Sequence, residues 1–398
     1  MNELRQGGAE SCINHQVPRC GEEPDEATRF ASLRLGGLAL NGGSNGRWRW
    51  LQKAGRHVFR LPRPRLTVKH LAERMKKLNH WTLTLLGFAL LSLKANSQDM
   101  PLSMLLIEGE GWKLVSEGHG FTDAPCADDK GNFYFSDMRS TPPAIWKVAP
   151  DGTKSKLLEG TSCSGLKWGP DGRLYACVGK DKQLVAFTLP DGKKTVVAED
   201  VQPNDLVVTH KGHVYFTETG KKQITFVNPK TGEKRAVDTG ITAPNGITVS
   251  PDQGTLAVSD SAGVHVWAMR IEADGSLTHK EPYMTLRTEV DTNAKSPDGR
   301  SPVYKTRSSG DGMTSDRQGR YYVASAVGVQ VFDPTGRMSG VLPKPTGKFM
   351  TSCGFGGPNM DVLYVTCADQ VFARKTKANG NLFFLPPPKD PPAAAKKK

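Results

Sequence analysis

The chain has 398 residues, a hydrophobic content of 37% and a formal net charge of +13, so it is long enough for one large folded domain or two modest ones. The charge is concentrated near the start: residues 1–74 hold 13 Lys and Arg against 7 Asp and Glu, and residues 75–97 add three Lys and no acid. Because a nucleic-acid-binding protein carries its basic surface on the folded domain, and residues 98–398 have a net charge of only +4, this distribution argues against a nucleic-acid partner.

Residues 75–97 are typical of a secretory signal peptide. They combine a basic start, an apolar stretch from Trp81 to Leu93 and small residues, Ala95 and Ser97, at a plausible cleavage point. The apolar stretch is shorter than the roughly 20 residues that a membrane span needs. We therefore expect export to the periplasm or the medium, with no stable membrane insertion after cleavage; an uncleaved anchor is the alternative.

Residues 1–74 are difficult to reconcile with a signal peptide behind them, because such signals act at the amino terminus. This stretch is rich in Arg and Gly and has no sustained apolar periodicity. We expect it either to lie upstream of a true start at Met75 or to form an unstructured extension.

From Met104 onwards the chain repeats a two-strand phrase. Its clearest copy is P-N-D-L-V-V-T-H-K-G-H-V-Y-F-T-E at residues 203–218, in which a Lys-Gly turn separates two apolar runs, the pattern of a β-hairpin. Related copies occur before and after it, and each places a polar residue at or near the start of its first apolar run. These positions are Asp123, Ser164, Asn204, Asn245, Asp311 and Ser352.

The spacing of the copies indicates the fold. Successive positions are separated by 41, 40, 41, 66 and 41 residues, and the longer step contains an insertion between Arg270 and Ser309. A period of about 40 residues with several turns and alternating apolar runs per unit is typical of a β-propeller and excludes helical repeats of similar length. The sequence therefore predicts an all-β, six-bladed propeller. One hypothesis for the insertion is that it covers the channel.

The ends of the repeat region predict how the ring closes. The run from Trp112 to Ser116 resembles the strand that ends each later unit, whereas the last unit stops after a third strand at residues 370–375. We therefore expect this early outer strand to complete the last blade of a propeller domain over residues 104–385, which leaves few exposed strand edges. Residues 386–398, rich in Pro, Ala and Lys, are expected to form a disordered tail.

The repeated polar positions predict a metal site. In a propeller the residue leading into each innermost strand lies at one end of the central channel, so these six side chains should converge there. All six carry oxygen, two as carboxylates and two as amides, and hard divalent cations prefer carboxylate and carbonyl oxygens. A single Asp or Asn at such a position is often only a turn former. The common phase of the repeat nevertheless favours one divalent cation, with Ca²⁺ first and Mg²⁺, Mn²⁺ or Zn²⁺ as alternatives.

Other polar residues should face the same end of the channel, after the second strand of their units. Asp137, Arg139, Glu218 and Asp260 are candidates for contact with a substrate, against the alternative that they only solvate strand ends. His119 is a candidate second base, against the alternative of a solvated loop residue. Residues 98–398 contain no G-x-S-x-G motif and no Ser stands out there as a nucleophile, which argues against a covalent ester-hydrolase route.

Export would also permit disulfides. Cys163 and Cys177, and likewise Cys353 and Cys367, are separated by 14 residues across the hairpin of a unit. A disulfide in each hairpin and a pair of buried free thiols are the two alternatives, with Cys126 left unpaired.

Taken together, several motifs resemble the senescence-marker-protein/gluconolactonase (regucalcin-like) family. The similarity extends from residue 112 to residue 375. The motifs are F-T-D-A-P at Phe121, P-N-D-L at Pro203, P-N-G-I-T-V-S-P-D at Pro244, G-D-G-M-T-S-D at Gly310, G-V-Q-V-F-D-P-T-G at Gly328 and F-G-G-P-N-M-D-V-L-Y-V-T at Phe355. The resemblance implies a six-bladed propeller that hydrolyses lactones with one divalent metal in the channel. It also implies that Asp123, Asn245 and Asp311 hold the metal, that Asn204 is a ligand or substrate contact, and that Asp311 is the general base.

The chain departs from the family pattern at several positions. Asp123 stands where the family usually has Glu, and Ser164 and Ser352 stand at or near positions where Asn is common. Gln202 stands where some sugar-lactone hydrolases have Arg, which argues against a sugar-acid lactone as substrate. Ser164 and Ser352 are still expected to contact substrate, although the pocket has fewer amide donors.

Two functions follow from this sequence. The first is a metal-dependent lactonase, in which a carboxylate accepts a proton from the water that attacks the lactone carbonyl and a cation polarises that carbonyl. The second is a non-catalytic calcium-binding propeller that binds a carbohydrate or protein partner, since the fold hosts many roles. The two retained acids favour the first function, and the replaced residues favour the second.

Overall fold

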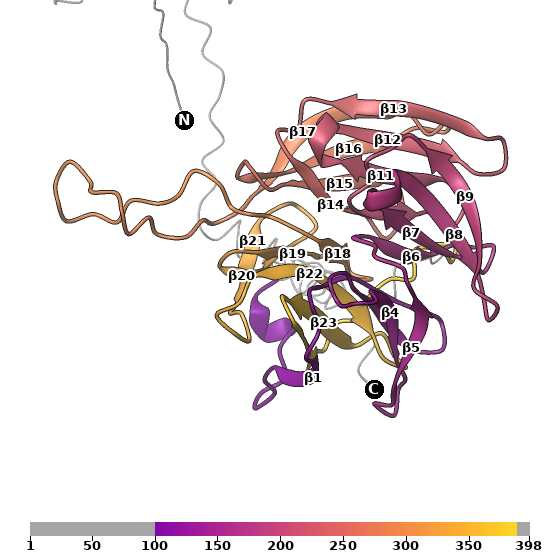
Figure 1. The fold of residues 1–398 in the computed structure, drawn as a ribbon. Coiled ribbons are helices and arrows are strands. Elements are labelled where there is room, and N and C mark those ends of the chain that lie inside the picture. Colours follow the sequence, from indigo (N-terminus) through magenta and orange to yellow (C-terminus); the bar gives the residue numbers. More distant parts are fainter. Residues whose placement is uncertain (1–99, 388–398) are drawn as a thin grey trace, which may run out of the picture. The chain divides into compact units, whose positions relative to one another are not determined.

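The computed structural model describes residues 100–387, which form six four-stranded antiparallel sheets (Figure 1). The innermost strand of each sheet contacts the innermost strand of the next, and the first contacts the last, so the six sheets close into a ring. This arrangement confirms the predicted all-β, six-bladed propeller. The predicted segments 1–74 and 75–97, and the predicted tail beyond residue 387, lie outside the described residues.

The first three blades are each built from four consecutive strands, from the innermost to the outermost. Their bounds are β2 (Thr122–Ala127), β3 (Phe133–Asp137), β4 (Ala144–Val148) and β5 (Lys154–Glu159); β6 (Leu166–Trp168), β7 (Leu174–Val178), β8 (Gln183–Thr188) and β9 (Lys193–Glu199); and β10 (Leu206–Val208), β11 (Val214–Glu218), β12 (Gln223–Asn228) and β13 (Glu233–Thr239).

Blades 4 and 5 follow the same order, whereas blade 6 takes its outermost strand from the start of the described chain. Their bounds are β14 (Pro244–Val249), β15 (Thr255–Asp260), β16 (His265–Ile271) and β17 (Leu277–Thr285); β18 (Met313–Ser315), β19 (Tyr321–Ser325), β20 (Gly328–Phe332) and β21 (Met338–Leu342); and β22 (Met350–Gly356), β23 (Val362–Cys367), β24 (Gln370–Lys375) and β1 (Lys113–Glu117). Helical structure in residues 100–387 is limited to the short 3₁₀ turns η1 (Leu102–Met104), η2 (Gly179–Asp181) and η3 (Thr219–Lys221). None of the helices in this part of the chain has the length and apolar character that crossing a membrane requires.

The hydrophobic core consists of clusters that lie between neighbouring blades. The cluster between blades 3 and 4, for example, joins Tyr215 and Phe226 to Ile247 and Leu256. All of β11 is buried, whereas most of β13 at the outer edge is exposed. Burying one large apolar side chain contributes roughly 1.5–3 kcal/mol, so the stabilisation is spread around the ring and the inner strands rest on a rigid scaffold.

The last blade closes as the sequence predicted. Strand β1 pairs with β24, with Lys113 opposite Ala373. The seam between blades 6 and 1 is packed by the stacked rings of Phe133 and Tyr364, whose centroids are 3.8 Å apart. Closure therefore joins the two ends of the repeat region through both backbone pairing and side-chain packing.

The structure decides between the two alternatives for the cysteines, disulfides or buried free thiols. All five in residues 100–387 are buried free thiols, so the disulfide alternative is wrong. In the last blade Cys353 lies opposite Val365 and Cys367 lies opposite Met350, so the two cysteines are not cross-strand partners. Burial raises the pKa of the Cys163 thiol to about 12, which keeps it protonated and unreactive.

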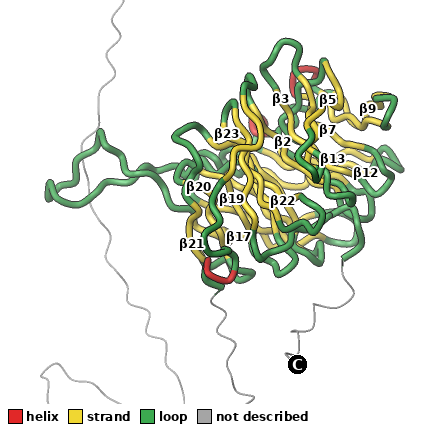
Figure 2. The backbone as a smooth tube through the Cα atoms, turned by 90° about the horizontal axis from the view of Figure 1, so that it is seen from below, coloured by secondary structure: helices red, strands yellow, loops and turns green. Residues whose placement is uncertain are grey.

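The predicted insertion is divided between two structures. Its first part forms β17, and residues 286–308 form an arm in which Val290 pairs with Tyr304. Figures 1 and 2 both show this arm extending outwards from the rim of the propeller. The hypothesis that the insertion covers the channel is therefore not supported.

Candidate active site at the channel mouth

The six repeated polar residues lie at the same end of the innermost strands. Three are within the start of β2, β14 and β22, and three stand two residues before β6, β10 and β18. Contacts between neighbouring blades connect these positions: the Ser164 hydroxyl donates to the Asn204 carbonyl oxygen at 2.7 Å, and a β-carbon on Gly312 would lie 1.8 Å from Ser352 Oγ. We call this end of the ring the channel mouth. The structure brings Asp123, Ser164, Asn204, Asn245, Asp311 and Ser352 to it.

A local distortion of the backbone sets the direction of Asp123. Ala124 has a left-handed φ of 58°, and the pairing of β2 with β3 shifts register between Asp123 and Cys126. The Ala124 amide donates to Asp123 Oδ1 at 2.8 Å. Non-glycine residues adopt such a conformation only when the surrounding structure imposes it, and such bulges are frequent beside active sites.

Burial, and to a smaller extent the charges of neighbouring carboxyl groups, raise the pKa values of the acids at the mouth. Burial raises the pKa of Asp123 to about 7, and the charge of Asp205 acts in the same direction. Burial also raises the pKa of Asp311 well above its usual value, with further contributions from the charges of Asp123 and Asp205; a hydrogen bond from the Asn245 side chain opposes the shift. Without a cation these carboxyl groups are therefore not all ionised at neutral pH.

Asp205 belongs to this group, although the sequence analysis did not select it. Its carboxylate is buried and accepts hydrogen bonds from the backbone amides of Leu206 at 2.8 Å and Ile247 at 3.3 Å. Burial raises its pKa. The only sign of Asp205 in the sequence is its place directly after Asn204 in the motif P-N-D-L. The direction of its side chain depends on the Ile247 amide of blade 4, and the local sequence does not reveal that contact.

Lys167, also missed by the sequence analysis, supplies positive charge to the channel. It lies on β6, and its ammonium group donates to the Pro125 carbonyl oxygen at 3.2 Å, two residues along β2 from Asp123. Its charge lowers the pKa of both Asp123 and Asp205, which partly opposes the effect of burial.

The donor set at the mouth fits a hard divalent cation in its chemistry. Among residues 100–387 no group of three His, Cys, Asp or Glu side chains forms a metal-binding cluster. The candidate set instead mixes the carboxylates of Asp123 and Asp311 with the amides of Asn204 and Asn245. A cation would favour the ionised form of both Asp123 and Asp311, because it opposes the repulsion of Asp123 on Asp311 and part of the cost that burial adds to ionisation. Ligation by these residues stays a prediction.

The candidate substrate contacts differ in how exposed their side chains are. Arg139 is exposed, and its guanidinium group lies 4.3 Å from the centre of the Phe121 ring, beside the loop that enters the mouth. Glu218 is buried, and its carboxylate accepts hydrogen bonds from the Gln202 amide at 2.7 Å and from Thr225 Oγ1 at 2.6 Å. The structure therefore leaves Arg139 available to a ligand and places Glu218 within its own blade.

Ser116, His119 and Asp137 have the hydrogen-bond connectivity of a nucleophilic triad. Ser116 Oγ lies 2.8 Å from His119 Nε2, and His119 Nδ1 lies 3.0 Å from Asp137 Oδ2. All three side chains are buried, and the imidazole packs against Phe135 and Trp146. Both ring nitrogens of His119 have hydrogen-bond partners and its side chain is buried, so it is not the solvated loop residue that the sequence offered as one alternative. Its contacts lie with β1 and blade 1, and none of them supports a role as a second base in the channel. The group links the closing strand β1 to blade 1.

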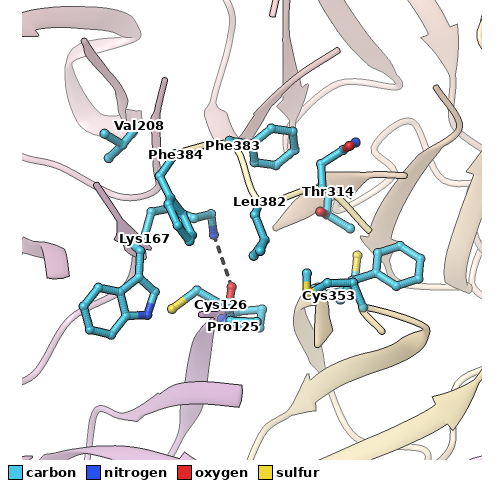
Figure 3. Close-up of a pocket in the computed structure, with 15 residues that line it drawn as sticks. Pro125, Cys126, Lys167, Val208, Thr314, Cys353, Leu382, Phe383 and Phe384 are labelled. Atoms are coloured by element: carbon cyan, nitrogen blue, oxygen red, sulfur yellow. Dashed lines mark hydrogen bonds between the residues drawn. The ribbon is translucent and has the colours of Figure 1, made fainter. Parts of the chain in front are cut away.

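The opposite end of the channel is covered by the C-terminal segment. A small cavity of about 40 Å³ lies there, lined by Cys126, Lys167, Cys353 and residues 382–384 (Figure 3). Gln253 Nε2 holds this segment by donating to the Phe383 carbonyl oxygen at 2.8 Å. Such a volume admits water but not a lactone ring.

Comparison with known proteins agrees with the family resemblance. A family model described as the SMP-30/gluconolactonase/LRE-like region matches residues 121–369. The gluconolactonase of Zymomonas mobilis subsp. mobilis is 24% identical over 309 residues, which cover 67% of this chain and 82% of the relative. The pentonolactonase XacC of Haloferax volcanii is 27% identical over 251 residues, which cover 60% of this chain and 78% of the relative.

Solved structures show the same fold. A gluconolactonase from Xanthomonas campestris superposes with a TM-score of 0.57 at 20% identity, covering 69% of this chain and 92% of that structure. A calcium-binding regucalcin from Agrobacterium tumefaciens superposes with a TM-score of 0.56 at 18% identity, covering 69% and 98%. These likenesses confirm the propeller architecture.

Proposed function

Because the chain belongs to the SMP-30/gluconolactonase/LRE-like family, we propose that it is a lactone hydrolase that acts with one divalent cation at the channel mouth. Its relatives named gluconolactonase and pentonolactonase support the reaction class. The observation that carries the proposal is the convergence of Asp123 and Asp311 at one end of the ring, where burial and the charge of Asp123 both raise the pKa of Asp311.

Asp123, Asn245 and Asp311 would hold the cation, with Asn204 as a further ligand or a substrate contact. Carboxylate and amide oxygens without sulfur or imidazole favour Ca²⁺, and Mg²⁺, Mn²⁺ or Zn²⁺ are alternatives. The name of the calcium-binding regucalcin neighbour agrees with Ca²⁺ as first choice. When bound, the cation supplies Lewis acidity that polarises a lactone carbonyl.

Asp311 is our candidate for the general base. It would accept a proton from the water that attacks the lactone carbonyl carbon, a role open to a carboxylate that a bound cation keeps ionised near neutral pH. Asn204, Ser164, Ser352 and Arg139 would orient the substrate from the rim of the mouth. The role of Ser164 is restricted, because its hydroxyl already donates to the Asn204 carbonyl oxygen.

The test combines a substrate panel with a matched pair of variants. Aldonolactones and aliphatic lactones are assayed with Ca²⁺, Mn²⁺ and Zn²⁺ for the wild type, for Asp311→Asn and for Asp333→Asn. Asp333 is a buried acid of the same blade that accepts the Thr335 amide at 2.8 Å, in the turn between β20 and β21 at the other end of the blade. We expect metal-dependent turnover that Asp311→Asn reduces by about 100-fold or more and that Asp333→Asn retains.

The same assay decides between a metal-dependent lactonase and a non-catalytic calcium-binding propeller. Tight Ca²⁺ binding without turnover on any lactone would contradict the hydrolase and support a non-catalytic calcium-binding propeller. Turnover that persists in chelator and survives Asp311→Asn would contradict both the cation and the base.

We also propose that the protein is exported through the signal peptide at residues 75–97. The support is the basic start, the apolar stretch and the small residues at its end. Expression of the full chain, followed by fractionation and amino-terminal sequencing, should find a mature protein that begins just after Ala95 or Ser97. A cytoplasmic, uncleaved product would contradict export.

A further inference from the structure

Three buried carboxylates occupy the same position in three blades. Asp137, Glu218 and Asp260 are the last residues of β3, β11 and β15, the second strand of their blades. Their exposed fractions are 2%, 1% and 4%. In each case the residue before the acid is a buried Ser or Thr, so the sequence reads F-S-D, F-T-E and V-S-D.

Each acid accepts hydrogen bonds from the backbone that leads into the mouth residue of its own blade. Asp137 Oδ1 accepts from the Gly120 amide at 3.0 Å, and Glu218 Oε1 accepts from the Gln202 amide at 2.7 Å. Asp260 Oδ1 accepts from the Ala243 amide at 2.9 Å. These amides stand only two or three residues before Asp123, Asn204 and Asn245.

The remaining lone pairs of these acids are also occupied within their blades. Asp137 accepts from Ser140 Oγ at 2.6 Å, Glu218 accepts from Gln223 Nε2 at 2.6 Å, and Asp260 accepts from the Gly263 amide at 3.1 Å. These hydrogen bonds outweigh burial and lower the pKa of Asp137 and Glu218. Because the oxygens of all three carboxyl groups already accept several hydrogen bonds from the protein, these groups anchor the loops and are not free to bind a substrate.

These acids occur in the blades of three of the four candidate metal ligands, and the blade of Asp311 is the exception. The blades that carry Ser164 and Ser352 at the mouth end their second strands with the apolar residues Val178 and Cys367. Blade 5 ends its second strand at Ser325 instead. Buried carboxylates therefore occur where the mouth residue is Asp123, Asn204 or Asn245, and not where it is serine.

We propose that Asp137, Glu218 and Asp260 are positioning residues that fix the loops from which Asp123, Asn204 and Asn245 reach the mouth. This inference rests on the proposed function of that site. A charged acceptor binds backbone amides more strongly than a neutral one, and groups that orient metal ligands typically change metal affinity or activity by about 10- to 100-fold when they are replaced.

The chain offers a matched control in the same blade as Asp137. Asp128 is a buried acid at the other end of β2, where it accepts hydrogen bonds from the Asn132 amide at 2.8 Å and the Tyr134 hydroxyl at 2.9 Å. Asp137→Asn and Asp128→Asn each replace one buried carboxyl group that accepts several hydrogen bonds within blade 1. Asp137→Asn removes hydrogen bonds at the mouth end of the blade, whereas Asp128→Asn removes them at the opposite end.

The experiment measures the melting temperature, Ca²⁺ and Mn²⁺ affinity by calorimetry, kcat and KM, and hydrogen exchange of residues 119–123, 200–204 and 241–245. We expect Asp137→Asn, Glu218→Gln and Asp260→Asn to weaken metal binding about 10- to 100-fold. Each should also speed exchange in its own loop at temperatures where the variant is folded. Asp128→Asn should lower the melting temperature while leaving metal affinity and mouth-loop exchange unchanged.

The outcomes separate this inference from the proposed function. If the wild type binds metal and hydrolyses lactones but the three variants change metal affinity and loop exchange no more than Asp128→Asn does, the positioning role is wrong. If the wild type binds no metal and hydrolyses no lactone, the proposed function is wrong, and the exchange measurements still test whether the acids hold the loops. Should one variant fail to fold, the other two carry the comparison.

Discussion

A β-carbon on Gly246 would lie 2.2 Å from the carbonyl oxygen of Asp311, so only glycine fits between the innermost strands of blades 4 and 5 at this point. Ser259 bridges the same two residues: its hydroxyl accepts from the Gly246 amide at 2.9 Å and donates to the Asp311 carbonyl oxygen at 2.9 Å. The Asn-Gly pair has the composition of a turn, but the glycine is required here by the close approach of two backbones.

Gly246→Ala should therefore damage both stability and the mouth. The added methyl group meets a backbone atom that cannot rotate away, and such overpacking costs about 1–3 kcal/mol. Because Asn245 and Asp311 stand on either side of the contact, Ca²⁺ affinity should fall as well. Gly347→Ala is the control, since nothing lies within 4 Å of a β-carbon there. Urea unfolding and calorimetry check both effects, and a Gly246→Ala protein as stable as wild type would contradict the close approach.

The raised pKa values at the mouth predict an unusual dependence of stability on pH. The pKa of Asp123 is about 7 in the folded protein, compared with 3.8 ordinarily, so the folded state binds more protons than the unfolded state between these values. Unfolding free energy then falls as pH rises through this window, by up to about 1.4 kcal/mol per pH unit for each such carboxyl group. Melting in chelator from pH 5.5 to 7.5 measures the slope.

Adding Ca²⁺ should remove most of that slope, because a bound cation keeps the carboxyl groups ionised in the folded protein. Asp137 and Glu218 do not contribute in this range, since their pKa values are lowered and they are ionised throughout it. The double variant Asp123→Asn, Asp311→Asn should show a smaller slope than the wild type, and Ca²⁺ should leave that slope unchanged. A wild-type slope that Ca²⁺ leaves unchanged would contradict a cation at these residues.

Lys167→Met should shift the pH dependence of activity. The Lys167 charge lowers the pKa of Asp123 and Asp205, so its removal leaves these groups protonated at higher pH. The acidic limb of the kcat/KM profile should move upward by about one pH unit. Lys193→Met changes an exposed lysine on the outer strand β9 and serves as the control. An acidic limb at the same pH in both variants would show that Lys167 does not act on the mouth.

The thiols of the propeller should all react once the protein is unfolded, without prior reduction. They are buried and free in the folded chain, and burial raises the pKa of Cys163 and Cys353 to about 12. Alkylation in denaturant followed by mass spectrometry should modify Cys126, Cys163, Cys177, Cys353 and Cys367. Reducing agent should leave the melting temperature unchanged. Unmodified Cys163 and Cys177 peptides joined to each other would contradict the free thiols.

The sequence by itself determined the architecture and the six repeated polar positions that lie at the mouth. Apolar runs separated by Gly-containing turns specify hairpins through contacts between residues close in the chain. The regular step from Asp123 to Ser164 and onward therefore revealed the blades. The missing fourth strand after Gln370–Lys375 likewise required a partner from elsewhere, which β1 supplies.

Only the tertiary structure decided what each polar group does. In the sequence, Glu218 and Arg139 are equally good candidates for contact with a substrate. In the structure Glu218 is buried and Arg139 is exposed. Asp205 and Lys167 act on the mouth only because neighbouring blades bring them within electrostatic reach of Asp123. The physical reason is that strand pairing depends on local alternation, whereas the direction of a side chain, its burial and its charged neighbours depend on packing between blades about 40 residues apart in the chain.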